Sequence, residues 1–128
     1  MTIEQRVQKL EEAIEGVQGV VRAREFALVD ASGEIRAALH LFEVGPALVL
    51  YDGDRKVRAG LMLLEDCPSL QLSDERGKPR AMLLVSNEGP ILSMNHANGS
   101  VGAALTVSTD ASGLVVYDQS GKAVARVV

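Results

Sequence analysis

The stretch "ALVLYDGDRKVRAGL", residues 47–61, contains the pattern from which most of this chain is built. It begins with apolar residues, continues through an Asp-led polar turn, and ends in a second apolar segment that contains Arg-Ala-x-Leu. Closely similar stretches lie before and after it at a spacing of 22 residues. We therefore interpret it as one unit of a repeat and not as an isolated motif.

The repeat runs through nearly the whole chain. Four copies align without a gap and a truncated fifth follows in phase, at residues 24–45, 46–67, 68–89, 90–111 and 112–128. Apolar residues recur at every second position on both sides of each turn, which is typical of a strand that buries one face. Each repeat therefore predicts two strands. The expected division is a helical or coiled-coil segment at residues 1–22 and a β-repeat domain at residues 23–128.

The turn in each repeat has its own residue pattern. Asp occupies the turn column in four of the five copies, and Gly follows three positions later in four. Asp caps backbone amides at the start of a type I turn, and Gly tolerates a positive φ, so the pattern predicts a tight reversal and antiparallel pairing. In the second copy Arg55 replaces the glycine, and we expect Gly53 to supply the left-handed residue. The predicted structural turn residues are Asp30, Gly33, Asp52, Asp74, Gly77, Gly99, Asp118 and Gly121.

One column after the turn is alanine in every copy. Its members are Ala37, Ala59, Ala81, Ala103 and Ala125. A small residue at every repeat indicates close approach of two backbones, as around the axis of an intertwined oligomer; a closed ten-stranded barrel with a partly unfilled interior is the alternative. A parallel solenoid also matches the period, but the tight reversals count against it. We predict an all-β fold, a repetitive antiparallel hairpin meander that is barrel-like, prism-like or intertwined between subunits.

The two faces of the predicted strands differ in composition. The leucine and alanine columns should form the buried face. The other face mixes apolar residues with Arg36, Arg58 and Arg80, and we expect it to contact another copy of the chain. The arginines are expected to pair with Glu25, Glu34 or other nearby acids and not to bind an anion.

The N-terminal segment predicts a short helix. Thr2 and Gln5 form a capping box, so the helix should begin at Ile3 and end between Glu15 and Gln18. Its apolar residues are spaced by four and three and form a heptad seam. A helix this short is marginally stable alone, so the seam should pack against the β-domain or form a parallel coiled coil that makes a dimer or trimer. The seam residues are Ile3, Val7, Leu10, Ile14 and Val17.

Composition excludes several classes of function. A net charge of −4 and a pI near 5.1 disfavour a nucleic-acid or anionic-membrane partner. A single cysteine, Cys67, excludes an internal disulfide or a cysteine metal cluster. The N-terminus is acidic where a secretory signal would be apolar, and no apolar run approaches the roughly 18 residues of a membrane span. We expect a cytoplasmic location, with export by a route that needs no cleaved signal left open.

No residue pattern predicts catalysis or ion binding. Repeated Asp turns bind calcium in some β-rolls, but those sites need several oxygens per turn and a glycine-rich nonapeptide, so turn capping is the favoured interpretation. His40 and His96 fall in different columns. The fourth copy differs most, and a polar ligand would be expected at its turn, although drift is favoured; the residues there are Ser93, Asn95, His96 and Asn98. We predict no enzyme activity and no catalytic, cofactor or metal site.

The unit D-x-x-G-x-x-R-A-x-L, present as "DASGEIRAAL" and "DERGKPRAML", resembles repeats in uncharacterised bacterial proteins that have a short N-terminal coiled coil. The resemblance covers residues 24–128 and implies a fibre or stalk layout in the style of phage tail proteins. The resemblance carries no known activity; from the residues we predict a non-enzymatic structural or protein-interaction module that self-associates through its helix and its β-repeat surface. The alternative function is a barrel that binds an apolar small molecule or a glycan.

Overall fold

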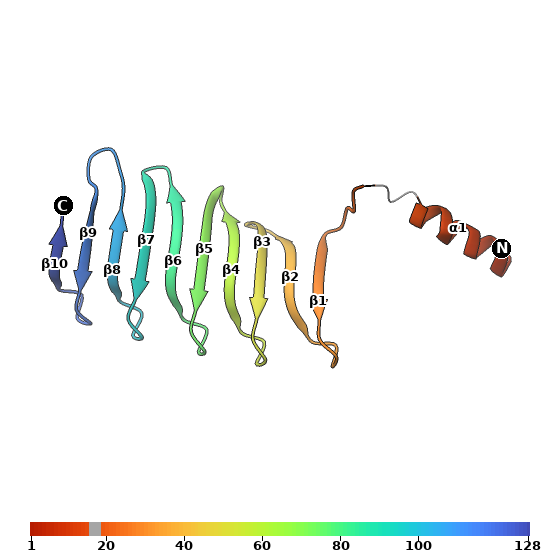
Figure 1. The fold of residues 1–128 in the computed structure, drawn as a ribbon, viewed down its shortest axis with the longest axis horizontal. Helices are drawn as coiled ribbons and strands as arrows, with labels where there is room; N and C mark the ends of the chain where they lie inside the picture. Colours follow the sequence, from red (N-terminus) through yellow and green to blue (C-terminus); the bar gives the residue numbers. More distant parts are fainter. Residues whose placement is uncertain (16–18) are drawn as a thin grey trace.

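The computed structural model describes residues 1–15 and 19–128, which form one helix and a sheet of ten strands (Figure 1). The strands follow one another across the sheet in chain order, and every neighbouring pair is antiparallel. The elements are α1 (Ile3–Glu15), β1 (Glu25–Val29), β2 (Ile35–Phe42), β3 (Gly45–Tyr51), β4 (Val57–Leu64), β5 (Cys67–Ser73), β6 (Pro79–Ser86), β7 (Gly89–Asn95), β8 (Val101–Thr106), β9 (Gly113–Tyr117) and β10 (Ala123–Val127). The predicted antiparallel meander is confirmed. The sheet is open, because β10 pairs with β9 and not with β1, so this chain forms neither a closed barrel nor a parallel solenoid.

The hairpin turns are built around the aspartate column. The carbonyl oxygen of Asp52 accepts the N–H of Arg55 at 3.1 Å, and Asp52 Oδ1 accepts the N–H groups of Asp54 and Lys56 at 2.9 and 3.1 Å. Equivalent bonds form in the other three aspartate turns. The carboxylate therefore satisfies amides that a tight turn would leave unpaired.

The residue three positions after the turn column is left-handed in all five turns. Gly33, Gly77, Gly99 and Gly121 have φ values from 80° to 90°, and Arg55 has a φ of 62°. The expectation that Gly53 supplies this conformation in the second repeat is therefore wrong. The hydrogen-bond ladder of the hairpin fixes which position must be left-handed, so a glycine two positions earlier cannot replace it.

We predict that Arg55→Gly raises the free energy of unfolding by about 1 kcal/mol, because a left-handed conformation costs a non-glycine residue roughly 1–2 kcal/mol. The exposed ion pair of Arg55 with Glu34 is lost, but such pairs contribute only about 0–1 kcal/mol. Gly77→Arg, at the matching position of the third repeat, should have the opposite effect. Chemical denaturation at a fixed protein concentration measures both. Destabilisation by both substitutions would contradict the assignment of strain to Arg55.

The first three connections between repeats use two turn geometries. Gly45 and Gly89 have φ values of 136° and 131°, and a Cβ at either would lie 1.9 Å from a backbone carbonyl oxygen. Only glycine fits there. Cys67 occupies the matching position of the next connection, where Glu65 (φ 47°) and Asp66 (φ 66°) adopt left-handed conformations instead. The cysteine is accommodated because the turn changes type, at the cost of two non-glycine residues with positive φ.

Helix α1 begins at Ile3, as the capping box predicts. The N–H of Thr2 donates to Gln5 Oε1 at 2.9 Å, and the N–H of Gln5 donates to Thr2 Oγ1 at 3.2 Å. The helix lies beyond β1 along the long direction of the sheet, and no described strand packs against it (Figure 1). Packing of the seam on the β-domain is therefore not observed within the chain. Val17, the last predicted seam residue, lies outside the described residues.

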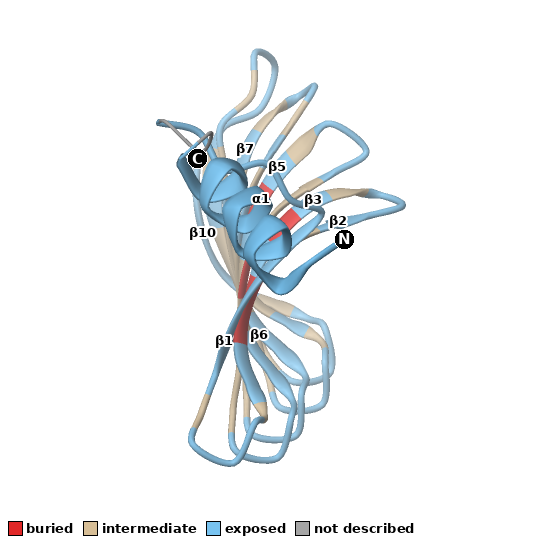
Figure 2. Ribbon diagram, turned by 90° about the vertical axis from the view of Figure 1, so that its right-hand side faces the viewer, coloured by how far each residue is buried: buried red, intermediate tan, exposed pale blue. Residues whose placement is uncertain are grey.

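The sheet is one layer thick, and it has almost no core of its own (Figure 2). Among the described residues, the buried apolar side chains are Ala37, Ala38, Ala47 and Val49, and no large side chain is fully buried. Shielding comes mainly from neighbours in the sheet, because neither face is covered by another element. A chain of 128 residues would ordinarily bury a substantial core. The apolar residues that would form it lie on the surface of this sheet.

Candidate interaction surface

Alternation along the strands places the leucine columns on one side of the sheet, here called the leucine face. Its centre is a row that crosses all ten strands, with each member paired in register with the next. The central row consists of Phe26, Leu39, Leu48, Leu61, Leu70, Leu83, Leu92, Leu105, Leu114 and Val127. The row is an unbroken line of apolar side chains along the long direction of the sheet.

The central row is exposed from end to end. Its least exposed member is Leu114, at 36%, and its most exposed is Val127, at 66%. A contiguous apolar surface of this length marks an interaction site in a soluble protein. The expectation that the leucine columns are buried is therefore wrong for the single chain. The reason is that no second layer covers the sheet among the described residues, and the alternation of leucines could not reveal this, because a meander can also close into a barrel.

The opposite side of the sheet, here called the small-residue face, is the better-shielded side. Ala38, Ala47, Val49, Ser69 and Ser73 on this face are all buried, at 5–9% exposure. Their side chains are short, so longer neighbours on adjacent strands cover them. The small-residue face was expected to contact another copy, but the larger apolar surface that is open to a partner is the leucine face.

A second row of the leucine face, on the side of the hairpin turns, alternates large and small residues. It consists of Leu28, Ala37, Leu50, Ala59, Leu72, Ala81, Met94, Ala103, Val116 and Ala125. Ala37 is only 8% exposed because Leu28 and Leu50 flank it, at 70% and 46%. The alanine column therefore forms notches between projecting side chains on every second strand.

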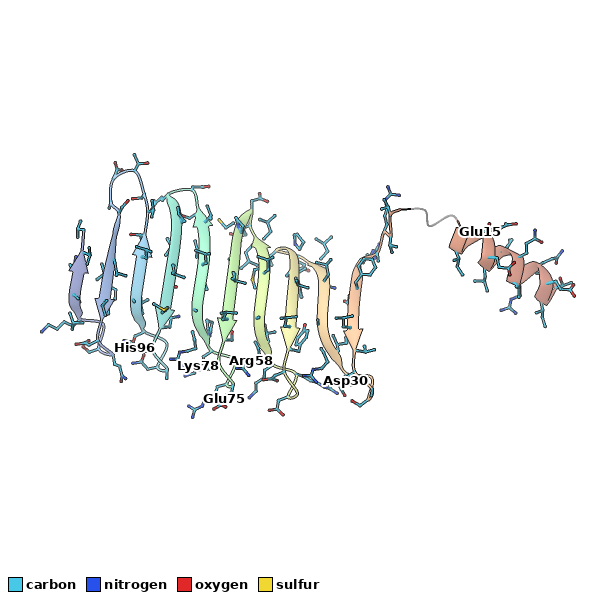
Figure 3. The ribbon with its side chains drawn as sticks, viewed as in Figure 1. Glu15, Asp30, Arg58, Glu75, Lys78 and His96 are labelled. Atoms are coloured by element: carbon cyan, nitrogen blue, oxygen red, sulfur yellow. The ribbon has the colours of Figure 1, made fainter. Side chains whose placement is uncertain are left out.

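Arginines along the hairpin-turn edge tie each repeat to the next (Figure 3). Arg58 Nε donates to the carbonyl oxygen of Ser73 at 2.9 Å, and Arg58 Nη1 lies 3.5 Å from Asp52 Oδ2. Arg36 and Arg80 make equivalent contacts in the first and third repeats. One carboxylate oxygen of each aspartate caps the turn while the other orients the arginine. The arginine column is thereby engaged in structure.

Lysines add a second set of contacts between successive turns on the same edge (Figure 3). Lys56 Nζ donates to the carbonyl oxygen of Glu75 at 3.0 Å, and Lys78 Nζ donates to that of Ala97 at 3.4 Å. These bonds join one hairpin tip to the next. The turns therefore form a connected ladder along one edge of the sheet.

The fourth repeat makes the same connection with different residues. His96 replaces the aspartate and Gly102 replaces the arginine. His96 Nε2 lies 3.0 Å from the carbonyl oxygen of Tyr117, the atom equivalent to those that the arginines hold. A Cβ on Gly102 would lie 3.2 Å from His96 Nε2, so the imidazole occupies the space that an arginine would need. Asn98 Oδ1 takes over the turn cap by accepting the N–H of Ser100 at 2.9 Å.

This arrangement gives the polar cluster of the fourth turn a structural role. Besides its cap, Asn98 donates through Nδ2 to the carbonyl oxygen of Gln119 at 3.0 Å, and Asn95 Nδ2 donates to that of Pro79 at 3.3 Å. The changes at His96 and Gly102 are coupled: Gly102 leaves room for the imidazole, and His96 takes over the contact with the carbonyl oxygen that an arginine makes in the first three repeats. This coupling is missed when each column of the repeat is considered by itself. The sequence does indicate it, because the aspartate and the arginine are both replaced in the same repeat.

We predict that His96→Asp and Gly102→Arg are each destabilising alone but compensate when combined. Gly102→Arg places a side chain against the imidazole, and His96→Asp leaves the carbonyl oxygen of Tyr117 without its side-chain partner. The double variant restores the pair found in the first three repeats, and its coupling energy should be about 1–2 kcal/mol. Denaturation of the four proteins completes the cycle. Effects that add to within about 0.5 kcal/mol would contradict the coupled exchange.

The turn aspartates have pKa values below the ordinary 3.8. For Asp52 and Asp74 the largest cause of the lowered pKa is the backbone N–H four residues on. For Asp30 and Asp118 it is the hydroxyl of the serine two residues on. A neighbouring basic side chain lowers each pKa further, and partial desolvation opposes the shift. The ionised carboxylates therefore stabilise the fold above the unfolded pKa, and this contribution is lost as the pH falls through the folded pKa.

We predict that Asp74→Asn lowers the thermal midpoint near neutral pH and that the gap from the wild type narrows below about pH 4. Asparagine keeps an oxygen that accepts the turn N–H groups, but it has no charge to lose on acidification. Thermal unfolding between about pH 6 and pH 3 measures the gap. A gap that stays constant over this range would show that the ionised carboxylate of Asp74 contributes nothing.

The small-residue face has a pocket of about 400 Å³ over the first two repeats. His40 Nδ1 lies 2.6 Å from Glu25 Oε2, and the His40 ring packs edge-to-face on Phe42 with centroids 4.4 Å apart. Arg55 pairs with Glu34 at the turn side. Glu25 and Glu34 therefore pair with His40 and Arg55. The predicted pairing of the arginine column with nearby acids is confirmed, but the acids are the turn aspartates and not these two glutamates. Each of the two glutamates thus lies beside a basic side chain that lines the same pocket.

No protein-family model matches the sequence, and no curated protein matches it. Across residues 1–15 and 19–128, no three His, Cys, Asp or Glu residues gather closely enough to hold a metal ion. None of the helical residues described belongs to a helix with the length and hydropathy that crossing a bilayer requires. The leucine face is thus the feature of this structure that most strongly indicates a function.

Proposed function

We propose that this chain is a non-enzymatic structural subunit that self-associates, as a dimer or trimer, through its leucine face and its N-terminal helix. The central row carries the proposal: ten paired apolar side chains cross the whole sheet, and nothing within the described chain covers them. A net charge of −4 favours a protein partner over nucleic acid or an anionic membrane. A second copy offers a surface of the same length and the same apolar character.

The accessible surface of the chain supports this proposal. The chain exposes 9819 Å², whereas a folded monomer of 13.6 kDa is expected to expose about 6,600 Å². The excess is roughly 3,200 Å² per chain, or about 6,400 Å² for two copies, which exceeds the roughly 2,000–5,000 Å² that obligate oligomer interfaces bury in total. Part of the excess belongs to the detached helix. A chain of this size that buries so little on its own matches a subunit better than a monomer.

The hydrophobic free energy gained by covering the central row is comparable to the free-energy cost of association. Complete burial of a leucine contributes about 1.5–3 kcal/mol, so covering the exposed part of each residue contributes about 1 kcal/mol. Ten such residues supply on the order of 10 kcal/mol, which is comparable to the roughly 4–15 kcal/mol cost of association. The flanking rows add to this gain. Self-association through the leucine face is therefore energetically reasonable without any polar contact.

The helix supports the same proposal from the other end of the chain. Ile3, Leu10 and Ile14 of the seam are 77%, 63% and 73% exposed, and no residue of α1 is buried. A helix of 13 residues is too short to be stable in water by itself. Contact with the helix of another copy would cover the seam, and a short coiled coil is the arrangement that its heptad spacing favours.

We predict that Leu70→Glu disrupts the assembly while Gln71→Glu leaves its mass unchanged. The two residues are neighbours in β5 and lie on opposite faces, with Leu70 in the central row, so they form a matched pair. A charge at Leu70 would be buried without a partner at the proposed interface. Sedimentation at micromolar concentration measures the mass of wild type and both variants.

A second measurement keeps this test decisive if Leu70→Glu fails to fold. The thermal midpoint of the wild-type chain should rise with protein concentration, because folding and association are linked. A wild-type chain that sediments as a folded monomer, with a concentration-independent midpoint, would overturn the proposed function. Equal disruption by Gln71→Glu would show that the leucine face has no special role.

A further inference from the structure

The leucine face has a third row, on the side of the connections between repeats, whose pattern mirrors that of the hairpin-side row. It contains Leu41, Pro46, Leu63, Pro68, Val85 and Pro90. Each even-numbered strand from β2 to β6 thus has alanine on the hairpin side and a bulky residue on the connection side. Each odd-numbered strand from β3 to β7 has a bulky residue on the hairpin side and proline on the connection side. The two outer rows are therefore complementary from β2 to β7.

Rotation about the long direction of the sheet brings these two rows together between copies. The hairpin-side row of one copy then faces the connection-side row of the next at the same strand, for a two-fold or a three-fold axis alike. The pairs are Ala37 with Leu41, Leu50 with Pro46, Ala59 with Leu63, Leu72 with Pro68, Ala81 with Val85 and Met94 with Pro90. A large side chain meets a small one at each level, which is the condition for close packing without voids.

Size matching alone does not fix the orientation, because a copy turned end to end also sets large residues against small ones. In that arrangement β3 faces β8 and Leu50 meets Ala103, for example. The difference lies in the helices. End-to-end reversal sends the two helices to opposite ends of the assembly and leaves both seams uncovered, whereas a parallel arrangement brings them together beyond β1.

The charges beside the seam also favour parallel helices. With Val7 and Ile14 at the a positions and Leu10 at d, Arg6 falls at g and Glu11 at e. Parallel helices bring g of one chain next to the following e of its neighbour, so Arg6 would face Glu11. Antiparallel helices bring e positions together and would set Glu4 against Glu11, two acids. The helix therefore favours the parallel arrangement of the copies, whereas the size matching in the sheet is compatible with both arrangements.

We infer that copies of this chain associate in parallel and in register around an axis along the sheet, with the leucine faces inward and the helices together at the β1 end. This inference rests on the proposed self-association and adds its orientation. Each central-row residue then faces its own equivalent in another copy. The alanine notches receive Leu41, Leu63 and Val85 of the neighbouring copy.

Cross-linking of cysteine variants tests the orientation, in a Cys67→Ser background that leaves no other thiol. Facing sheets lie about 10 Å apart, so a bifunctional maleimide of that span is the reagent. Leu48→Cys, Leu105→Cys and Leu10→Cys should each cross-link to themselves. Gln71→Cys, on the small-residue face, is the matched control and should not. Co-expressed Leu48→Cys and Leu105→Cys chains with tags of different size should give homotypic products only.

The outcomes separate the orientation from the self-association. Heterotypic Leu48–Leu105 products without homotypic ones would overturn the parallel arrangement and leave self-association standing. An oligomeric mass with no cross-link at any of the three positions would also overturn the inference, because the copies would then meet elsewhere. A monomeric mass for the wild-type chain would overturn both the inference and the proposed function.

Charge reversal on the helix tests the orientation independently, because the change in the association constant depends on which residue Glu11 faces. Glu11→Arg should weaken association about twofold to fivefold in a parallel assembly, because it faces Arg6, and Arg6→Glu in the same chain should restore it. In an end-to-end assembly the helices lie at opposite ends, so Glu11→Arg would leave the association constant unchanged. Sedimentation equilibrium measures the association constant, and an unchanged or strengthened constant would overturn the parallel arrangement.

Discussion

A sheet one layer thick cannot bury its own apolar face, and the rest of this structure depends on that constraint. In a sandwich or an α/β fold a second layer covers the leucines, but here the ten strands form the whole β-domain and the helix lies apart from them. The buried apolar side chains of the described chain are three alanines and one valine. The hydrophobic energy that ordinarily folds a domain is therefore available for contacts between chains.

The turn chemistry matters because it keeps that apolar face continuous. A slip of one residue in any hairpin would send the leucines of a strand to the opposite side of the sheet. Register is held at the hairpin edge by the aspartate caps and by Arg36, Arg58 and Arg80, which reach the next repeat. In the last repeat the aspartate remains as Asp118, while Val124 takes the arginine position.

The strands, the turns and the start of the helix could be predicted from the sequence, whereas the exposure of each face of the sheet could not. A period of 22 residues with alternating leucines predicts the strand order, and Thr2 with Gln5 predicts the start of the helix. The same alternation says only that Leu48 and Leu50 share a face; it does not say whether anything covers that face. Exposure depends on a second layer, which is a property of the whole assembly. Likewise, the left-handed φ of Arg55 follows from the hydrogen-bond ladder and not from residue type.

The five repeats themselves indicate where the functional constraint lies. Columns at the turns vary: His96 and Gly102 replace the Asp and Arg pair, and Cys67 stands where the first and third repeats have glycine. Each of these changes has a solution within the chain, through a histidine donor or a different turn type. Alanine never varies in its column, and the central row remains large and apolar throughout, although this face has no local partner that would require either property. The proposed association would account for both properties, because another copy would cover the exposed central row and place side chains in the notches at the alanines.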